Sequence, residues 1–239
     1  MWKMWFCIVI LLLIAGVFAE VERELHTFCI TRYKVLSPKW NGEKSGKIIF
    51  LSDLHNHEYG LHNKKLIDKI KKENPELILI GGDILVGKED ISYESAAEFV
   101  EAICKIAPVY YANGNHEQRM KEKPEKYGNA FVGYKKRLLD AGVHFLENES
   151  AEVELGGNKL CLTGLELQLE VYEKMKTHKV TKEDVAQKVG PTKQEEIQIL
   201  LAHNPEYMEA YQAWGSDITL SGHLHGGLIC LPNGKSVIT

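Results

Sequence analysis

Short apolar runs alternate with amphipathic stretches along most of the chain. Apolar runs of strand length lie at 47–52, 77–80, 108–112, 197–202 and 217–220, and a partly alternating run precedes them at 25–36. Apolar residues at helical spacing lie at 61–73, 92–106, 131–141 and 205–213. Strands and helices that alternate in this order are typical of a layered α/β domain.

Two stretches in the second half are harder to place. Residues 143–164 contain three short strand-like runs, separated by 148–150 and 156–158, which indicates a hairpin. Residues 167–189 are charged and helix-prone, and are interpreted either as a solvated helical pair or as a cap that selects substrate. In the second interpretation, an apolar substrate group contacts Leu167, Leu169, Val171 and Tyr172.

The N-terminus differs from the rest, because residues 4–19 (MWFCIVILLLIAGVFA) carry no charge. Such a helix spans about 24 Å at ~1.5 Å per residue, a little short of a ~30 Å hydrocarbon core. Val17 and Ala19 suit a signal-peptidase site, so 1–19 is either a signal anchor or a signal peptide. Lys3 before the segment and acidic residues after it predict export. We therefore expect a domain at the cell membrane, outside the cytoplasm, that is secreted if the signal is cleaved.

Composition narrows the class of protein. With 239 residues, 44% hydrophobic and 26% charged, the chain is neither disordered nor a multi-span membrane protein. Its length allows one sizeable domain, which we place at 47–239, after a lead-in strand and connection at 20–46. A formal net charge of −4 without a long Lys/Arg run argues against nucleic acid as a partner. Five scattered cysteines without C-x-x-C spacing indicate neither a zinc ribbon nor a disulfide framework.

Polar clusters follow five of the predicted strands. They are D-L-H at 53–55, G-G-D at 81–83, G-N-H-E at 114–117, H-N at 203–204 and G-H-L-H at 222–225. Residues i and i+2 of an extended chain point to the same side, so Asp53 and His55 can share one metal. His223 and His225 form a second pair of this kind. Neighbouring glycines let the backbone turn sharply toward a common centre.

The clusters supply two carboxylates, one amide oxygen and four imidazoles. The candidate ligands are Asp53, His55, Asp83, Asn115, His203, His223 and His225. This mixture suits two divalent metal ions of the Mn, Fe or Zn kind better than magnesium or calcium, which prefer oxygen ligands. Two such metals activate a water as nucleophile near neutral pH, usually with a carboxylate as bridge. Asp83, in the middle of the set, is the candidate bridge.

The order D-x-H, G-D, G-N-H-E, H and G-H-x-H, each block after a strand, resembles the calcineurin-like metallophosphoesterases. The resemblance covers roughly residues 45–232. The run LLAHNPEYMEAYQAWGSDITLSGHLHGG and the apolar N-terminus resemble the bacterial membrane-associated branch of that family. The family implies a four-layer αββα sandwich, here preceded by the N-terminal hydrophobic segment.

The resemblance also implies a role for each candidate residue. Asp53, His55 and His225 would hold one metal, with Asp83 as the bridge. The second metal would be held by Asn115, His203 and His223. His116 would be catalytic, as an imidazolium that acts on the leaving-group oxygen or on the phosphoryl charge. Glu117 is expected to orient neighbouring ligands.

The sequence departs from the family pattern in two places. Val86 stands where purple acid phosphatases have a tyrosinate ligand, which argues against a ferric-tyrosinate site. Members of the branch usually continue several tens of residues past the G-H-L-H-G-G block. This chain stops at Thr239, so we expect the C-terminal strands of the sandwich to be truncated.

Together these features predict a hydrolase of a phosphodiester, pyrophosphate or phosphomonoester, acting through a water activated by two metals. The apolar N-terminus favours a lipid-linked or envelope substrate. A nuclease of the same superfamily is one alternative, although the sequence shows no plain basic groove or aromatic platform. A non-catalytic metal-binding module of the envelope is another, although such a module would be expected to have lost candidate ligands. The oligomeric state does not follow from the sequence.

Overall fold

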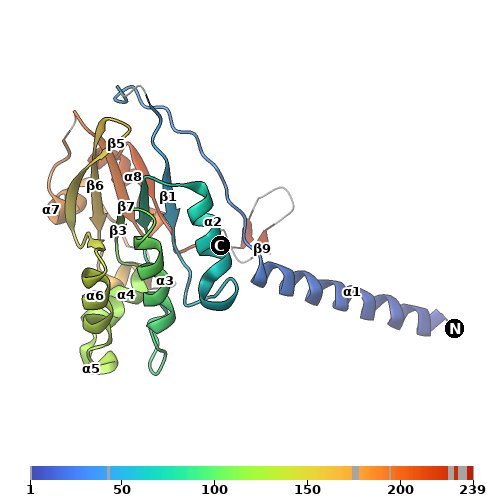
Figure 1. Ribbon diagram of the computed structural model, residues 1–239. Coiled ribbons are helices and arrows are strands. Elements are labelled where there is room, and N and C mark those ends of the chain that lie inside the picture. The colour runs from blue at the N-terminus through green and yellow to red at the C-terminus, as the bar shows by residue number, and fades with distance from the viewer. Residues whose placement is uncertain are drawn as a thin grey trace.

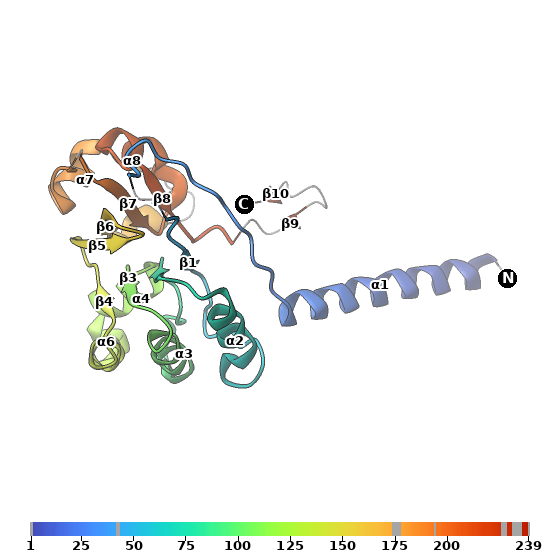
Figure 2. The same ribbon diagram turned by 45° about the horizontal axis from the view of Figure 1, so that its top comes forward.

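Two β-sheets pack face to face, and helices cover the outer face of each (Figures 1 and 2). The computed structural model describes residues 2–41, 44–173, 178–193, 195–225, 229–230 and 236–238. The four layers confirm the predicted αββα sandwich.

The first sheet consists of four parallel strands in the order β1-β2-β3-β4. These are β1 (Ile48–Leu51), β2 (Leu77–Ile80), β3 (Val109–Tyr111) and β4 (His144–Phe145). The second sheet has the order β5-β6-β7-β8, with only β5 antiparallel to its neighbour. Its strands are β5 (Glu149–Leu155), β6 (Asn158–Leu165), β7 (Ile197–Ala202) and β8 (Ile218–Leu220). β5 and β6 form the predicted hairpin.

Helices connect the parallel strands and cover the sheets. Over the first sheet lie η1 (Leu61–Asn63), α2 (Lys64–Glu73), α3 (Glu94–Cys104), α4 (Asn115–Glu122), α5 (Pro124–Tyr127) and α6 (Ala130–Asp140). Over the second lie η2 (Leu169–Tyr172), α7 (Lys182–Val189), η3 (Pro205–Tyr207) and α8 (Met208–Trp214). A separate antiparallel pair, β9 (Ile229–Cys230) and β10 (Ser236–Ile238), follows β8.

Alternation along buried strands divides the interior into three apolar clusters. In β2, Leu77 and Leu79 face the second sheet, whereas Ile78 and Ile80 face the helices of the first. In β7, the odd-numbered residues of 197–201 point into the same inter-sheet core. Its outward residues pack with α7, η2 and α8. Strands buried on both faces read as continuous apolar runs, which explains why they stand out in the sequence.

The N-terminal helix α1 (Trp2–His26) is longer than the apolar segment at 4–19 and has no buried residue. Its length and composition would allow it to cross a membrane, a property it shares with signal sequences. The predicted strand at 25–36 is wrong: its first two residues end α1, and 27–36 contains neither helix nor strand. Most of its side chains are exposed, and it pairs with none of the strands that the structure describes.

Residues 167–189, interpreted above either as a solvated helical pair or as a cap that selects substrate, are partly buried in the structure. Leu167 and Val171 are buried in the core beneath α7 and α8, with Val185. They therefore support the sandwich rather than offering contacts to an apolar substrate group. The ring of Tyr172 instead lies against two histidines of the site described below, 6.1 Å from that of His203 and 5.1 Å from that of His223.

Candidate metal centre

The predicted ligands lie at the carboxyl ends of parallel strands from both sheets. Asp53 and His55 follow β1, and Asp83 follows β2. Asn115 begins α4 just after β3, while His203 follows β7. His223 and His225 follow β8. The carboxyl ends of the paired parallel strands meet at the same edge, which brings residues 170 positions apart into contact.

Asp83 occupies the middle of the site and is 2% exposed. Its Oδ1 accepts the backbone N–H of His116 at 2.9 Å. Its Oδ2 faces three imidazole nitrogens, at 3.1 Å from Nε2 of His203, 3.8 Å from that of His55 and 3.9 Å from that of His116. One oxygen is thus fixed by the backbone, and the other is directed at the centre of the histidines.

Asp53 forms the second acidic centre. Its Oδ1 accepts the backbone N–H of His223 at 2.9 Å. The same oxygen lies 3.5 Å from Nε2 of His225, 3.8 Å from that of His203 and 4.0 Å from that of His55. The Nε2 atoms of His55 and His225 are 3.0 Å apart, with stacked rings. Asp53, His55 and His225 therefore form one compact group that could hold a metal ion.

A second group of possible ligands includes both carboxylates. Asp53, Asp83 and His203 present donor atoms within 4.8 Å of one another. The His223 ring lies 5.5 Å from that of His203. Asn115 is buried beside His116, whose backbone holds Asp83.

The residues fit a metal because two buried donor atoms lack a hydrogen-bond partner. These are Oδ1 of Asn115 and Nε2 of His203. Buried polar atoms normally have hydrogen-bond partners, and leaving such an atom without one costs about 1–3 kcal/mol. Nδ1 of His203 lies 2.7 Å from the carbonyl oxygen of Gly81, to which it must donate. This bond leaves the Nε2 lone pair of a neutral His203 free to bind a cation.

Many of the site residues have left-handed backbone conformations. Positive φ angles are found at Asp53, His55, Asp83, His223 and His225, between 48° and 71°. Such conformations are uncommon for residues other than glycine and concentrate at functional sites. They turn the side chains off the strand ends toward the common centre.

Charge and burial determine the protonation of the histidines. Burial lowers the pKa of His55 and of His223. Burial also acts against the charged form of His203, but the carboxylates of Asp83 and Asp53 outweigh it and raise its pKa to about 9. Without a metal, a proton on His203 therefore balances part of the acidic charge. Burial opposes ionisation of Asp83, yet His203 and His116 lower the pKa of its carboxyl group.

His116 differs from the other histidines in its hydrogen bonding. The backbone N–H of Gly87 donates to Nδ1 of His116 at 2.8 Å. A neutral ring then carries its proton on Nε2, the nitrogen that points toward Asp83. Burial lowers the pKa of His116 to about 4, so this ring is neutral at pH 7 in the metal-free chain. In the metal-free chain His116 is thus a neutral N–H donor, whereas the family resemblance implies an imidazolium.

Glu117 organises the site from beneath, with an exposed fraction of 0%. Its carboxylate accepts the backbone N–H of Asp83 at 2.8 Å and those of Ile84 and Gly114 at 3.0 Å. Tyr111 donates its hydroxyl to the same group at 2.7 Å. Burial and the charge of Asp83 raise the pKa of Glu117 to about 7. Glu117 therefore ties the Asp83 loop to the start of α4.

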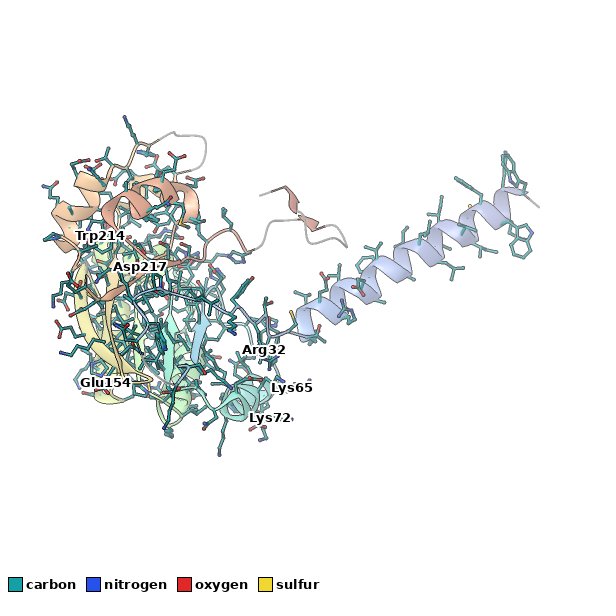
Figure 3. The ribbon with its side chains drawn as sticks, turned by 90° about the horizontal axis from the view of Figure 1, so that it is seen from above. Arg32, Lys65, Lys72, Glu154, Trp214 and Asp217 are labelled. Carbon is teal, nitrogen blue, oxygen red and sulfur yellow. The ribbon has the colours of Figure 1, made fainter. Side chains whose placement is uncertain are left out.

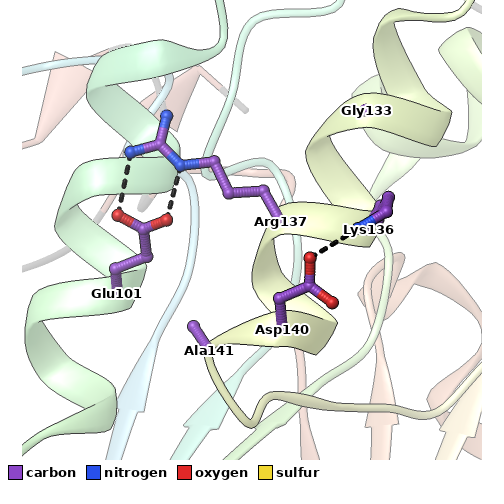
Figure 4. Close-up of a pocket in the computed structure, with 6 residues that line it drawn as sticks. All are labelled: Glu101, Gly133, Lys136, Arg137, Asp140 and Ala141. Atoms are coloured by element: carbon purple, nitrogen blue, oxygen red, sulfur yellow. Dashed lines mark hydrogen bonds and ion pairs between the residues drawn. The ribbon is translucent and has the colours of Figure 1, made fainter.

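A separate hollow of about 340 Å³ lies between α3 and α6 (Figure 4). Its charged side chains are paired, Arg137 with Glu101 and Lys136 with Asp140. It lies near the C-terminal ends of these helices, which lead into β3 and β4, at the opposite end of the sheet from the histidines. It contributes nothing to the metal centre.

The fold and the site define a class, the metal-dependent hydrolases of phosphoric ester bonds. The chain belongs to the calcineurin-like phosphoesterase family, whose profile matches residues 46–227. Members of this family use a dinuclear divalent metal centre, which confirms the predicted kind of cofactor.

The chain is similar to several proteins at low sequence identity. It is 25% identical to the uncharacterized protein YpbG of Bacillus subtilis over 85% of this chain and 68% of that one. It is 26% identical to the phosphodiesterase YaeI of Escherichia coli, over 78% of this chain and 63% of YaeI. The crystal structure of a phosphopantetheinyl hydrolase from Mycobacterium tuberculosis aligns with a TM-score of 0.47 at 12% identity, covering 75% of this chain and 83% of that one.

Proposed function

We propose that the seven side chains hold two divalent metal ions and that the chain hydrolyses a phosphodiester or pyrophosphate. Asp53, His55 and His225 would hold one metal, and Asp83 would be shared by both. The second would be held by Asn115, His203 and His223. The observation that carries this assignment is Asp83, whose Oδ1 is held by a backbone N–H while Oδ2 faces three imidazoles.

Two such metals, when bound, polarise the phosphoryl oxygens and lower the pKa of water. The protein side chains supply the remaining steps. Nε2–H of His116 donates a hydrogen bond to the phosphoryl or leaving-group oxygen, because its Nδ1 is already occupied by Gly87. Since that same N–H points into the site, His116 is assigned to substrate rather than to a metal.

The substrate class and location extend this proposal. The name of YaeI supports a diester. Helix α1 supports a membrane anchor and a lipid-linked or envelope substrate, with the domain at 47–239 outside the cytoplasm, because Lys3 precedes the apolar segment and acidic residues follow it. Manganese is the first metal to test, followed by iron and zinc.

The test is hydrolysis of bis-p-nitrophenyl phosphate by the full chain after chelation and after return of each metal. Asp83→Asn is compared with Asp140→Asn, a surface change on α6. Activity that needs metal, disappears in Asp83→Asn and persists in Asp140→Asn is the expected result. A folded chain that binds two metals but hydrolyses neither this diester nor p-nitrophenyl phosphate would contradict the proposal.

A further inference from the structure

The chain that leaves α1 attaches to the domain almost immediately. Phe28 lies two residues after the end of α1, and its ring is 4.9 Å from that of Tyr59. Four residues later, Arg32 donates to Glu73 at the end of α2, at 2.7 Å. Two contacts so close to the helix end leave little free tether. The surface around Tyr59 and α2 therefore stays beside the base of α1.

This attachment lies next to the metal centre. The ring of Tyr59 is 4.7 Å from that of His57, which is two residues after the candidate ligand His55. The loop that begins at Asp53 thus reaches Tyr59 and continues through η1 into α2. A membrane crossed by α1 would consequently lie close to the site loop.

Helix α2 carries an unbalanced positive charge on its exposed side. It contains five lysines, one aspartate and one glutamate. Asp68 pairs with Lys64 at 2.9 Å, and Glu73 is shared by Arg32 and Lys69. Lys65, Lys71 and Lys72 are exposed and form no ion pair within the part of the chain that the structure describes. The acidic Glu20 and Glu24 at the end of α1 pair with Arg23 instead.

The lysines without ion pairs lie on the side of the domain that adjoins the C-terminal end of α1. Figure 3 shows Lys65, Lys72 and Arg32 together near the base of α1. Each lysine close to an anionic bilayer strengthens binding to the headgroups, raising the binding constant by about fivefold. The positive charge of α2 and its short connection to α1 therefore both favour an anionic bilayer as the partner of this side of the domain.

We propose that α2 presents Lys65, Lys71 and Lys72 to the anionic headgroups of a bilayer that α1 crosses. This inference rests on the proposed function, in which α1 is an anchor. The contact holds the site loop at the membrane surface, so that the substrate is a phosphate ester carried by the bilayer. The lysine face serves to orient the domain, and the metal ligands perform the reaction.

The test is lysine acylation of the full chain in nanodiscs. One set contains phosphatidylcholine alone, and the other contains phosphatidylcholine and phosphatidylglycerol in a ratio of about 7:3. We expect Lys65, Lys71 and Lys72 to react at least ~10-fold more slowly in the anionic discs, and the protection to vanish in 1 M salt. Lys182 on α7, in the outer layer of the other sheet, should react equally in both.

A pair of charge-reversal variants provides the matched control. Lys65→Glu with Lys72→Glu should abolish the protection of Lys71, whereas Lys182→Glu with Lys188→Glu should preserve it. Hydrolysis of a soluble diester in detergent should be unchanged in both, because neither pair touches the site. Equal acylation rates in the two lipids, or a chain that does not remain with the discs, would overturn the inference.

The two failures are distinguishable. Acylation needs no turnover, so an inactive chain with protected lysines would count against the proposed hydrolysis alone. An active chain with unprotected lysines would count against the membrane-facing role of α2 alone.

Discussion

The backbone N–H of Gly87 donates a hydrogen bond of 2.8 Å to Nδ1 of His116. This single contact distinguishes His116 from its neighbours, because Nδ1 of His203 instead donates to a carbonyl oxygen. A neutral His203 therefore offers a lone pair at Nε2, whereas a neutral His116 offers a proton at the same position. Two imidazoles that face one carboxylate oxygen are thereby suited to different tasks.

The first prediction follows from this difference. His116→Ala should lower kcat for diester hydrolysis by roughly 10²–10⁴-fold, the usual contribution of a positioned proton donor, while the metal content stays unchanged. His203→Ala should instead reduce the metal content. Both quantities are measured on the same samples, by steady-state kinetics and elemental analysis. His62→Ala, at an exposed position, is the control. Loss of metal in His116→Ala would show that His116 is a ligand.

The second prediction concerns pH. In the metal-free chain the pKa of His203 is about 9, against an ordinary value of 6.5. Because protonation of His203 is favoured in the folded state, it contributes about 3 kcal/mol to the free energy of unfolding below pH 6.5. This contribution is lost as the pH rises through 9. Urea unfolding in the presence of a chelator should therefore show lower stability at pH 9.5 than at pH 6.

Metal should reverse this trend, because the ion competes with the proton on His203 and binds more tightly as pH rises toward 9. His203→Gln removes the titrating group and should flatten the profile of the metal-free chain. A wild-type profile that is already flat between pH 6 and pH 9.5 would show that His203 is neutral in the metal-free site.

Much of the fold and of the site composition could be predicted from the sequence, for physical reasons. Strands such as 77–80 and 197–202 are buried on both faces and are therefore apolar throughout. Polar residues directly after them must lie at the ends of parallel strands, which brings distant ligands together. The family, the fold, the hydrolase class and the kind of cofactor are confirmed, and the individual ligand assignments stay predictions.

The elements that could not be predicted from the sequence are determined by tertiary contacts rather than by the pattern of apolar residues. Helix α4 is missing from the sequence-based elements because it is polar, and its buried Glu117 and Gln118 are held by hydrogen bonds. Glu117 three residues after Gly114 resembles a helix-start signal that could have located it. The predicted strand at 25–36 is wrong although its residues alternate in part, because the segment attaches to the domain through single side chains, Phe28 on Tyr59 and Arg32 on Glu73, rather than through backbone pairing.

The third prediction tests the carboxylate under the site. Glu117→Gln keeps the shape of the side chain but replaces an oxygen acceptor by an NH₂ donor among backbone N–H groups. The free energy of unfolding should fall by roughly 2–4 kcal/mol, because buried donors lose a charged acceptor. Metal affinity should fall as well, since Asp83 loses its support. Glu98→Gln, at an exposed position on α3, should change neither quantity in urea unfolding or metal titration. Unchanged metal affinity in a destabilised Glu117→Gln would limit Glu117 to a role in folding.

The fourth prediction concerns Gly222, which lies against Asp53. A Cβ at this position would lie 2.1 Å from Oγ of Ser52 and 2.3 Å from Oδ2 of Asp53. Gly222→Ala must therefore displace the carboxylate and should weaken metal binding by about 10–100-fold, as changes that misorient a ligand commonly do. Gly16→Ala, where a Cβ meets nothing within 4 Å, is the matched control. Metal titration followed by calorimetry measures both variants. An unchanged metal affinity in Gly222→Ala would mean that the Asp53 carboxylate can move without loss of metal binding. The position of Asp53 would then not matter for the site, which contradicts its assignment as a ligand held in place by the fold.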